Sequence, residues 1–382
     1  MTTGNPFRYG DVATGDYFTN RVQELDEVTA DVSTGQNIVI ISPRRYGKTS
    51  LMFEAMRRLR ERKILIAYID LFKAPTKDRF TDLLANALFT GLISPLERAM
   101  KDAVALFQRL PLTPRITIGP NGMPTFEFSA TQRSRDIDRT IEELLALPGR
   151  IAAERGRGTA IVFDEFQEIL AIDEHLPGVM RAVFQTQPDV AHVFLGSTKH
   201  LMHEVFTNRY QPLYKLAKPV ILRPISTDAF AAFIQARFTS TGFTIEPAAC
   251  QRVLAITGGH PHDTQELCYF LWAFACAMQL PSVASDHVDT ALTQVLDAES
   301  AHYITLWQEL SAHQRQVLIA IAAEPTAVYS EGYRQQHRLG PASSVQRSIT
   351  RLVEDDLIEP ASRGMYSISD VFLREWITAR AQ

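Results

Sequence analysis

Residues 37–50 read Asn-Ile-Val-Ile-Ile-Ser-Pro-Arg-Arg-Tyr-Gly-Lys-Thr-Ser, and this stretch decides the fold of the chain. The apolar run at 38–41 predicts a buried strand, a short loop follows it, and a helix-forming stretch begins at Leu51. Strand, loop, Gly-Lys-Thr and helix in this order are typical of a phosphate-binding P-loop. In such a loop Lys48 reaches the β- and γ-phosphates, and the hydroxyl of Thr49 ligates Mg²⁺.

One position departs from the usual P-loop pattern, which has glycine where this chain has Ser42. The first glycine lets the loop turn sharply, so a serine there weakens the motif. A Gly-Lys-Thr triplet by itself also occurs by chance. Whether the chain binds a nucleotide therefore depends on whether it carries the second half of such a site.

The second half is found at residues 159–165, Thr-Ala-Ile-Val-Phe-Asp-Glu, an apolar strand that ends in two carboxylates. This is the form of a Walker B strand, in which the first acid, here Asp164, holds Mg²⁺. Glu165 is placed to orient or deprotonate a water that attacks the γ-phosphate. The alternative is an ordinary core strand followed by a solvated acidic turn, but the P-loop favours the catalytic interpretation. The two motifs together predict ATP as the ligand and Mg²⁺ as its metal.

The composition bounds what else the chain can do. With 382 residues it is long enough for two or three domains, and its net charge of −4 excludes a global basic field for nucleic acid. Cys250, Cys268 and Cys276 lack metal-binding spacing and fit a reducing cytosol. No apolar segment of a secretory signal or of membrane-spanning length is found. We expect a cytoplasmic protein with no membrane partner.

Strands and helices alternate over the first half of the chain. Apolar, partly β-branched runs predict strands covered on both faces, as in a parallel sheet, and helical stretches separate them. The alternation predicts an α/β fold, with a P-loop core of doubly wound parallel sheet at residues 1–225. The predicted strands are residues 38–41, 64–71, 160–163, 192–195 and 220–222, and the helices are 51–62, 80–109, 137–155 and 176–187.

A segment at about 111–130 interrupts this alternation with two short alternating runs around Asn121 and Gly122. An Asn-Gly pair between such runs is a hairpin signal. We expect a β-hairpin insertion that projects from the core and offers a contact surface for a protein partner.

The predicted strands of the core stop after Pro224. Helical stretches at 227–241, 247–257, 263–279 and 285–296 predict a helical domain over residues 226–299. From 300 to 382, three further helical stretches precede two short strands that flank Arg363 and Gly364. Three helices and a β-wing predict a winged helix-turn-helix.

These residues together resemble the archaeal and bacterial P-loop ATPases related to the AAA+ and STAND groups, over nearly the whole chain. The segments at 5–10 and 17–25 are similar to the N-terminal segment that precedes the first strand in the family. The loop from Ser42 is similar to the family's P-loop. In that family a Pro-Arg-Arg core is typical and the first glycine is often replaced. The Gly-Gly-His-Pro at 258–261 resembles an element of its helical lid, and residues 367–376 resemble the end of its winged helix.

The resemblance implies roles for further residues. Arg21 and its neighbours would lie near the adenine, and His260 with Pro261 would close over the nucleotide as part of the lid. A polar sensor of the γ-phosphate would be Ser197 or Thr198, and a simple turn residue is the alternative for Ser197. The loop residues that would hold the nucleotide are Ser42, Pro43, Arg44, Arg45, Tyr46, Gly47, Lys48, Thr49 and Ser50.

One position departs from the family. An arginine commonly follows Pro-Leu-Tyr-Gly there, whereas residues 211–216 of this chain read Gln-Pro-Leu-Tyr-Lys-Leu, so Leu216 stands in its place. An arginine supplied in trans raises the rate of P-loop enzymes by orders of magnitude. Arg209 is a candidate catalytic replacement, with an ordinary surface arginine as the alternative. The other basic residues nearby are Lys215, Lys218 and Arg223.

The predicted recognition helix of the winged helix carries Arg347 and Arg351 on its outward side, where they suit phosphate and base-edge contacts with DNA. The charge of the segment from 301 to 382 argues the other way. It has eight arginines against nine carboxylates, a net charge of −1. DNA binding and a protein-interaction or autoinhibitory role both stay open.

Three functions follow from these features. The first is Mg²⁺-dependent ATP binding and hydrolysis that drives a switch or motor. The second is an ATP-regulated DNA-binding protein, either a regulator or an origin-recognition-like initiator. The third is a signalling or defence scaffold that assembles, as a homo-oligomer, in its ATP state. ATP and ADP are partners in all three, and the first is the function we expect.

Overall fold

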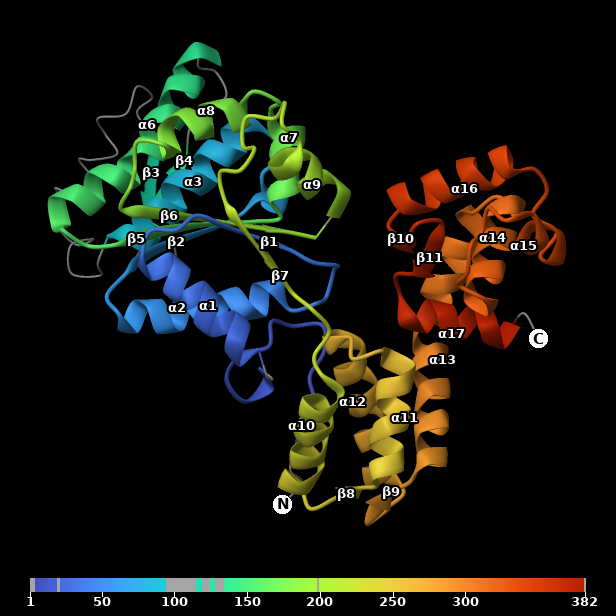
Figure 1. The fold of residues 1–382 in the computed structure, drawn as a ribbon. Helices are drawn as coiled ribbons and strands as arrows, with labels where there is room; N and C mark the ends of the chain where they lie inside the picture. The colour runs from blue at the N-terminus through green and yellow to red at the C-terminus, as the bar shows by residue number, and fades with distance from the viewer. Residues whose placement is uncertain are drawn as a thin grey trace. The chain divides into compact units, whose positions relative to one another are not determined.

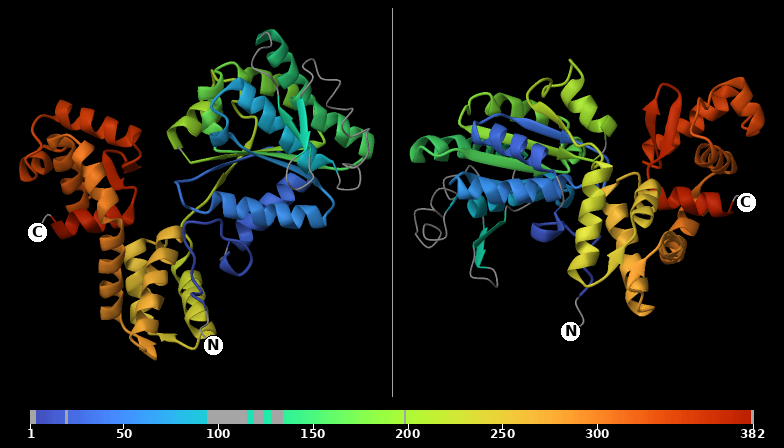
Figure 2. Two further views of the ribbon diagram at one scale, coloured as in Figure 1. Left: turned by 180° about the vertical axis from the view of Figure 1, so that it is seen from behind. Right: turned by 60° about the horizontal axis from the view of Figure 1, so that its bottom comes forward.

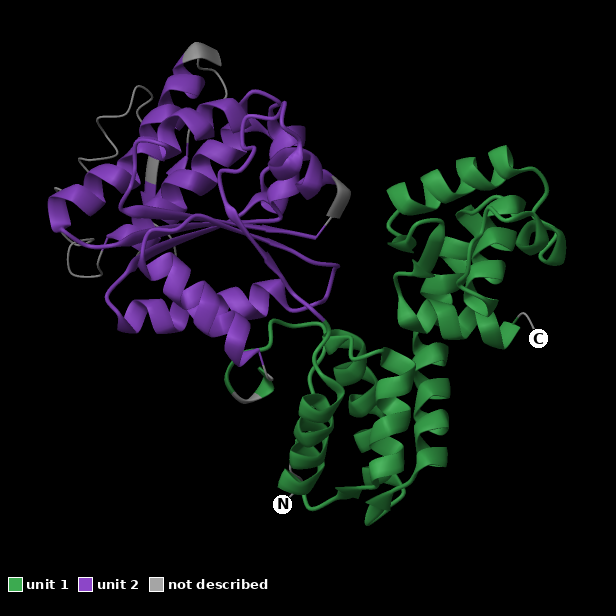
Figure 3. Cartoon of the chain, in the orientation of Figure 1, with its two compact units in different colours: residues 1–20, 224–382 green, residues 21–223 purple. Residues whose placement is uncertain are grey.

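The fold was described from a computed structural model that places residues 4–18, 21–93, 115–118, 124–127, 134–197 and 199–380 (Figure 1). The chain divides into two compact units, shown in different colours in Figure 3. Unit 2 is the continuous segment 21–223, and unit 1 combines residues 1–20 with residues 224–382.

Unit 2 is built on a five-stranded sheet in the order β2-β5-β6-β1-β7, and every neighbouring pair is parallel. This confirms the parallel α/β core and the five predicted strands. All residues of β5 and β6 are buried, as expected of central strands with helices on both faces. The strands are β1 (Ile38–Ile41), β2 (Leu65–Asp70), β5 (Thr159–Asp164), β6 (Val190–Gly196) and β7 (Lys218–Ile221).

Helices cover both faces of this sheet (Figures 1 and 2). One face carries α1 (Val22–Ser33) and α2 (Lys48–Glu61), and the other carries α3, α6, α7, α8 and α9. Apolar side chains of α3 and α6 share one core with phenylalanines of β5 and β6, where the rings of Phe163 and Phe194 stack. The helices of this second face are α3 (Lys77–Leu92), α6 (Ser134–Arg155), α7 (Ile169–Ile172), α8 (Leu176–Phe184) and α9 (Lys199–Thr207).

The predicted hairpin insertion is present as two antiparallel strands, β3 (Arg115–Ile118) and β4 (Pro124–Glu127). Asn121 and Gly122 lie outside the described residues. The amide side chain of Asn86 on α3 bonds both the N–H and the carbonyl of Phe126, and Phe126 is fully buried. Strand β4 is therefore anchored on α3. The predicted helix at 80–109 ends at Leu92, because Ile93 is extended, and residues 94–114 lie outside the described part of the chain.

Unit 1 begins with a group of helices: α10 (Thr227–Ser240), α11 (Pro247–Thr257), α12 (Pro261–Ala277) and α13 (Ser285–Glu309). Two-residue strands β8 (Thr244–Ile245) and β9 (Ser282–Val283) pair between them. Residues 4–18, which the sequence predicts to belong to the ATPase core, pack in this unit. Phe7 is buried against Phe233 and Phe238 of α10, and this apolar contact explains the difference.

The rest of unit 1 has the helices and wing of a winged helix, which confirms that prediction. Helix α13 runs through the predicted boundary at 299/300 to Glu309, because no glycine or proline interrupts it. The ring of Trp307 on α13 packs edge-on against Trp376 of α17, so the two parts share a core. The elements are α14 (Ala312–Ala323), α15 (Glu331–Gln336), α16 (Ala342–Glu354), β10 (Ile358–Ser362), β11 (Met365–Ile368) and α17 (Val371–Arg380).

Among the helices of the described residues, none is both long and apolar enough to cross a membrane.

Candidate active site

The carboxyl ends of three neighbouring strands meet at one edge of the unit 2 sheet. Strand β1 leads into the P-loop, β5 ends at Asp164, and β6 leads into Ser197. Strand β6 lies between the other two. After β1 the chain next enters the sheet at β2, the outermost strand on the far side of β5. Ligands of open parallel sheets bind at such a point, outside the carboxyl ends of the strands.

The backbone of the P-loop shows why serine is tolerated at its first position. Left-handed conformations occur at Arg45, with φ 61°, and at Gly47, with φ 85°, but not at Ser42. Glycine is favoured only where φ is positive, so the turn at Ser42 does not require it. Ser42 is buried at the end of β1, whereas Arg44 and Arg45 are exposed.

Helix α2 begins at Lys48, directly after the loop, so its amino-terminal N–H groups are at the loop. Thr49 and Ser50 occupy its first turn. The ammonium of Lys48 is buried and donates hydrogen bonds of 3.0 Å to the carbonyl oxygens of Ser42 and Pro43. A buried ammonium held by two carbonyls inside a loop of this form is placed to exchange them for phosphate oxygens.

Asp164 is the centre of a cluster of oxygen atoms. Its Oδ2 accepts hydrogen bonds from the hydroxyl of Thr49, at 3.0 Å, and from the hydroxyl of Tyr68, at 2.6 Å. Its Oδ1 accepts the backbone N–H of Glu165 at 2.9 Å. Burial raises the pKa of Asp164, the charge of Glu165 adds to this, and the bond from Tyr68 offsets part of it. A divalent cation would favour the ionised carboxylate, and hydroxyl and carboxylate oxygens are ligands that suit Mg²⁺.

Glu165, directly after Asp164, has a strained backbone conformation. Its φ is 51°, an uncommon left-handed conformation for a residue other than glycine. Its Oε2 accepts hydrogen bonds from the hydroxyl of Ser197, at 2.8 Å, and from the side-chain amide of Gln167. That amide also reaches Ser197, at 3.3 Å. The structure thus brings the predicted base and the predicted sensor into direct contact.

Two residues of the site were not found by sequence reasoning. Tyr68 is a hydroxyl-bearing residue in an apolar strand, and its register opposite Val162 places it near the end of β5. Gln167 lies two residues after Glu165 in a 3₁₀ turn. Its side-chain oxygen is buried and has no hydrogen-bond partner among the described residues. In the sequence alone, a tyrosine in a strand and a glutamine after an acid carry no distinctive signal.

Arg21, which the resemblance puts near the adenine, supports the loop itself. Its guanidinium is buried, donates to the carbonyls of Tyr46 and Arg223 at 3.0 Å each, and pairs with Glu24 at 3.1 Å. Burial lowers the pKa of Arg21, and the charge of Glu24 opposes that shift. Arg21 therefore joins the P-loop to the end of β7.

The basic residues around Leu216 have other contacts. Leu216 itself packs partly buried against the unit 2 core. Arg209 is exposed and stacks on the ring of Tyr210, with 4.7 Å between the guanidinium carbon and the ring centroid. Lys218 pairs with Glu27 and Asp31 at 2.8 Å each. The ammonium of Lys215 lies over the ring of Tyr214.

Two further predicted residues, His260 and Pro261, belong to unit 1. They start helix α12, after a turn in which Gly258 and Gly259 have φ values of 60° and 73°. Thr198 is not among the described residues.

The strand order, the loop and the acid pair define the core of a P-loop nucleoside triphosphatase. Residues 18–267 match the model of the family described as "ATPase domain predominantly from Archaea", and the chain belongs to that family. Residues 301–379 match a family described as a probable winged helix domain. No curated protein matched the chain in sequence.

Solved structures similar to the chain span its whole length. The Walker-type ATPase PABY2304 of Pyrococcus abyssi superposes with a TM-score of 0.68 at 15% identity, covering 98% of this chain and 99% of that one. The ORC1 protein of Aeropyrum pernix, solved in complex with DNA, gives a TM-score of 0.51 at 15% identity, with 96% of each chain covered. The ORC2 protein of Aeropyrum pernix, solved in ADPNP–ADP complexes, gives 0.50 at 14% identity, covering 99% of this chain and 98% of that one. At these identities the likeness shows the fold alone.

Proposed function

We propose that the protein hydrolyses ATP with Mg²⁺ bound at Thr49 and Asp164. The observation that carries this proposal is the hydrogen bond between those two side chains, which joins the P-loop to the end of β5. It places a hydroxyl and a carboxylate oxygen, the two protein ligands typical of the metal in P-loop enzymes, side by side. The bound metal would neutralise negative charge on the phosphates.

The neighbouring residues have complementary tasks. Lys48 would leave the carbonyls of Ser42 and Pro43 and bind the β- and γ-phosphates. Glu165 would orient the attacking water and accept its proton, while Ser197 and Gln167 hold the carboxylate in place. The buried side-chain oxygen of Gln167, which has no hydrogen-bond partner among the described residues, would accept a hydrogen bond from that same water.

The test is phosphate release from ATP by the wild type, Lys48→Ala and Glu165→Gln, each with excess Mg²⁺. We expect both variants to lose turnover by two orders of magnitude or more, since each lacks an interaction made with the reacting groups. Arg252→Ala is the matched control, because it removes an exposed arginine that pairs only with Asp289 in unit 1 among its described contacts. Equal rates in the wild type and both site variants would overturn the proposal.

We further propose that the energy of hydrolysis moves the parts of the chain as a switch or motor. The division we propose is an ATPase core that ends at 225 and carries the hairpin at 111–130, a lid at 226–299 that uses His260 and Pro261 and packs against Phe7 of the N-terminal segment, and a winged helix at 300–382. A homo-oligomer in which Arg209 completes a neighbouring site, and a protein partner at the hairpin, belong to the same proposal. Equilibrium sedimentation with ADP and with a non-hydrolysable ATP analogue tests the assembly, which Arg209→Ala would leave intact while lowering turnover.

DNA binding through the winged helix is a second candidate function, and one surface feature favours it. An open groove of about 460 Å³ lies between α14 and α16, and Arg347 and Arg351 line it together with Gln314 and Ser344. Arg347 is exposed and, within the described part of the chain, donates a hydrogen bond only to Ser344, at 3.4 Å. Arg351 pairs with Glu354 and Asp355, which reduces what it can offer to a phosphate. The similar fold of ORC1 was solved with DNA, which supports testing this surface.

A salt titration of duplex binding tests this candidate. Each phosphate contact lowers the logarithm of affinity by about 0.9 per decade of salt, so Arg347→Ala should flatten the slope by about one unit. Arg351→Ala should have a smaller effect, because Asp355 already engages that guanidinium. Arg338→Ala is the control, because Arg338 lies in the connection between α15 and α16 and does not line the groove. DNA affinity that does not depend on salt concentration, or equal changes in slope in all three variants, would contradict a role for this groove.

A further inference from the structure

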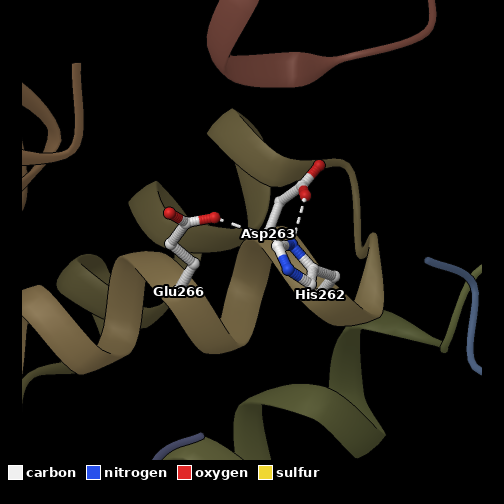
Figure 4. A group of neighbouring side chains, drawn as sticks. All are labelled: His262, Asp263 and Glu266. Carbon is white, nitrogen blue, oxygen red and sulfur yellow. Dashed lines mark hydrogen bonds and ion pairs between the residues drawn. The ribbon is translucent and has the colours of Figure 1, made fainter. Parts of the chain in front are cut away.

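A second group of acidic side chains lies in unit 1, in the first turns of α12. Asp263 and Glu266 are both buried, with side chains only 7% and 5% exposed, and His262 beside them is 13% exposed (Figure 4). One potential ligand atom from each residue lies within 4.8 Å of the other two. Buried carboxylates require a positive partner, so the group needs an explanation of its own.

The helix itself brings these three residues together. Positions 262 and 266 are one turn apart and share a face of α12, and position 263 is adjacent. The turn at Gly258 and Gly259 and the proline at the start of α12 fix where the helix begins. The ring of Tyr9 packs edge-on against the imidazole of His262, with 5.9 Å between the ring centroids, and so limits its movement.

The distances within the group suit coordination. Nδ1 of His262 lies 3.2 Å from Oδ1 of Asp263 and 3.6 Å from Oε2 of Glu266. Charge-assisted hydrogen bonds are shorter, about 2.7–2.9 Å. A tetrahedral ion with bonds of about 2.0–2.2 Å places its ligand atoms about 3.3–3.6 Å apart, close to both of these separations.

We propose that His262, Asp263 and Glu266 form a binding site for one transition-metal ion of the zinc class. An imidazole with two carboxylates suits zinc, cobalt or nickel, whereas Mg²⁺ and Ca²⁺ take oxygen ligands. A divalent cation balances two ionised carboxylates beside a neutral imidazole. The other oxygen of Asp263 lies 3.1 Å from Nδ1 of His260, and such an outer partner orients a ligating carboxylate.

The competing state is a proton on the imidazole of His262, which would pair with the same carboxylates. Metal and proton occupy the same Nδ1 atom, so metal binding must release that proton. The metal and a proton therefore exclude each other at this imidazole.

The experiment is a titration of tag-free, EDTA-treated full-length protein with Co²⁺ and no nucleotide, followed by visible absorption. A tetrahedral site gives intense bands, and Zn²⁺ added afterwards displaces the cobalt. We expect one ion per chain in the wild type, loss of the bands in His262→Gln, and binding at least tenfold weaker in Glu266→Gln. His287→Gln removes an imidazole that bonds the N–H of Ala284 in the same unit, and Asp164→Asn alters the P-loop site; both should bind one ion normally.

Several results would overturn the proposal. If the wild type does not bind one Co²⁺ or Zn²⁺ ion per chain, the proposal is overturned whatever the variants show. Unchanged binding by His262→Gln, or loss of binding in Asp164→Asn, would place the ion elsewhere. If a variant does not fold, judged by far-UV circular dichroism, the wild type still decides, since Zn²⁺ must raise its melting temperature and EDTA must reverse the shift.

Discussion

Two pairs of acidic residues in the molecule, Asp164 with Glu165 and Asp263 with Glu266, differ in their neighbours. Asp164 is surrounded by hydroxyl groups, and burial raises its pKa. Burial alone would also raise the pKa of Asp263, but hydrogen bonds from His260 and His262 outweigh it and lower that pKa to about 2. The neighbouring donors, rather than the burial that both share, decide how each carboxylate behaves.

The difference has an energetic meaning. A carboxyl whose pKa is higher in the folded protein than in the unfolded chain binds its proton more tightly when folded, so its ionisation at neutral pH costs stability. Asp164 is in that position, as residues that serve function often are. Asp263 has the opposite shift, and its ionised form stabilises the fold. The first site is prepared for a cation that arrives with the nucleotide, and the carboxylate of the second site lies beside two imidazoles.

The largest effect that separates the two pairs is expected from Asp164→Asn. Turnover should fall on the order of 100-fold or more, because a metal ligand is lost. The melting temperature without nucleotide should stay the same or rise, because the buried charge is removed while an amide oxygen still accepts a hydrogen bond. Phosphate release and calorimetry at pH 7 measure both. A fall in melting temperature that accompanies the loss of turnover would contradict this view of Asp164.

Asp263→Asn is expected to change the stability of the fold in the opposite direction. The free energy of unfolding should decrease by about 2–3 kcal/mol at pH 7 with EDTA present, because a shift of about two pKa units is lost. The stabilisation of the wild type is complete above the ordinary pKa of aspartate, about 3.9, and is lost as the pH falls through about 2. Urea unfolding of both proteins between pH 7 and pH 2.5 should therefore show a difference in stability that narrows toward the acid end. A difference that stays constant with pH would show that ionisation is not its source.

A smaller effect is expected from Gln167→Leu, which keeps the size of the side chain and removes its amide. Gln167 positions Glu165 and Ser197 without being the base itself. We expect kcat to fall about tenfold, or about 1.4 kcal/mol, with little change in the KM for ATP. Steady-state kinetics against ATP concentration give this split. A rise in KM with unchanged kcat would assign Gln167 to nucleotide binding instead.

Much of the core could be predicted because its signals are local. Short apolar runs and the Gly-Lys-Thr loop gave the five strands and the carboxyl edge where Lys48, Asp164 and Ser197 gather. The packing of residues 4–18 in unit 1 could not be predicted, because it depends on the contact of Phe7 with α10. Tyr68 was missed because its role follows from the pairing of β2 with β5, a contact distant in sequence.

The central claim, that the P-loop and the Asp164–Glu165 strand form one Mg²⁺-ATP hydrolysing site, is tested most directly by the ATP retained on Glu165→Gln. The variant, loaded with radiolabelled ATP and Mg²⁺ and then desalted, should keep unhydrolysed ATP, while Lys48→Ala handled in parallel keeps little. EDTA should release the nucleotide from Glu165→Gln. Recovery of ADP and phosphate from Glu165→Gln at the wild-type rate, or equal retention by Lys48→Ala, would contradict the account.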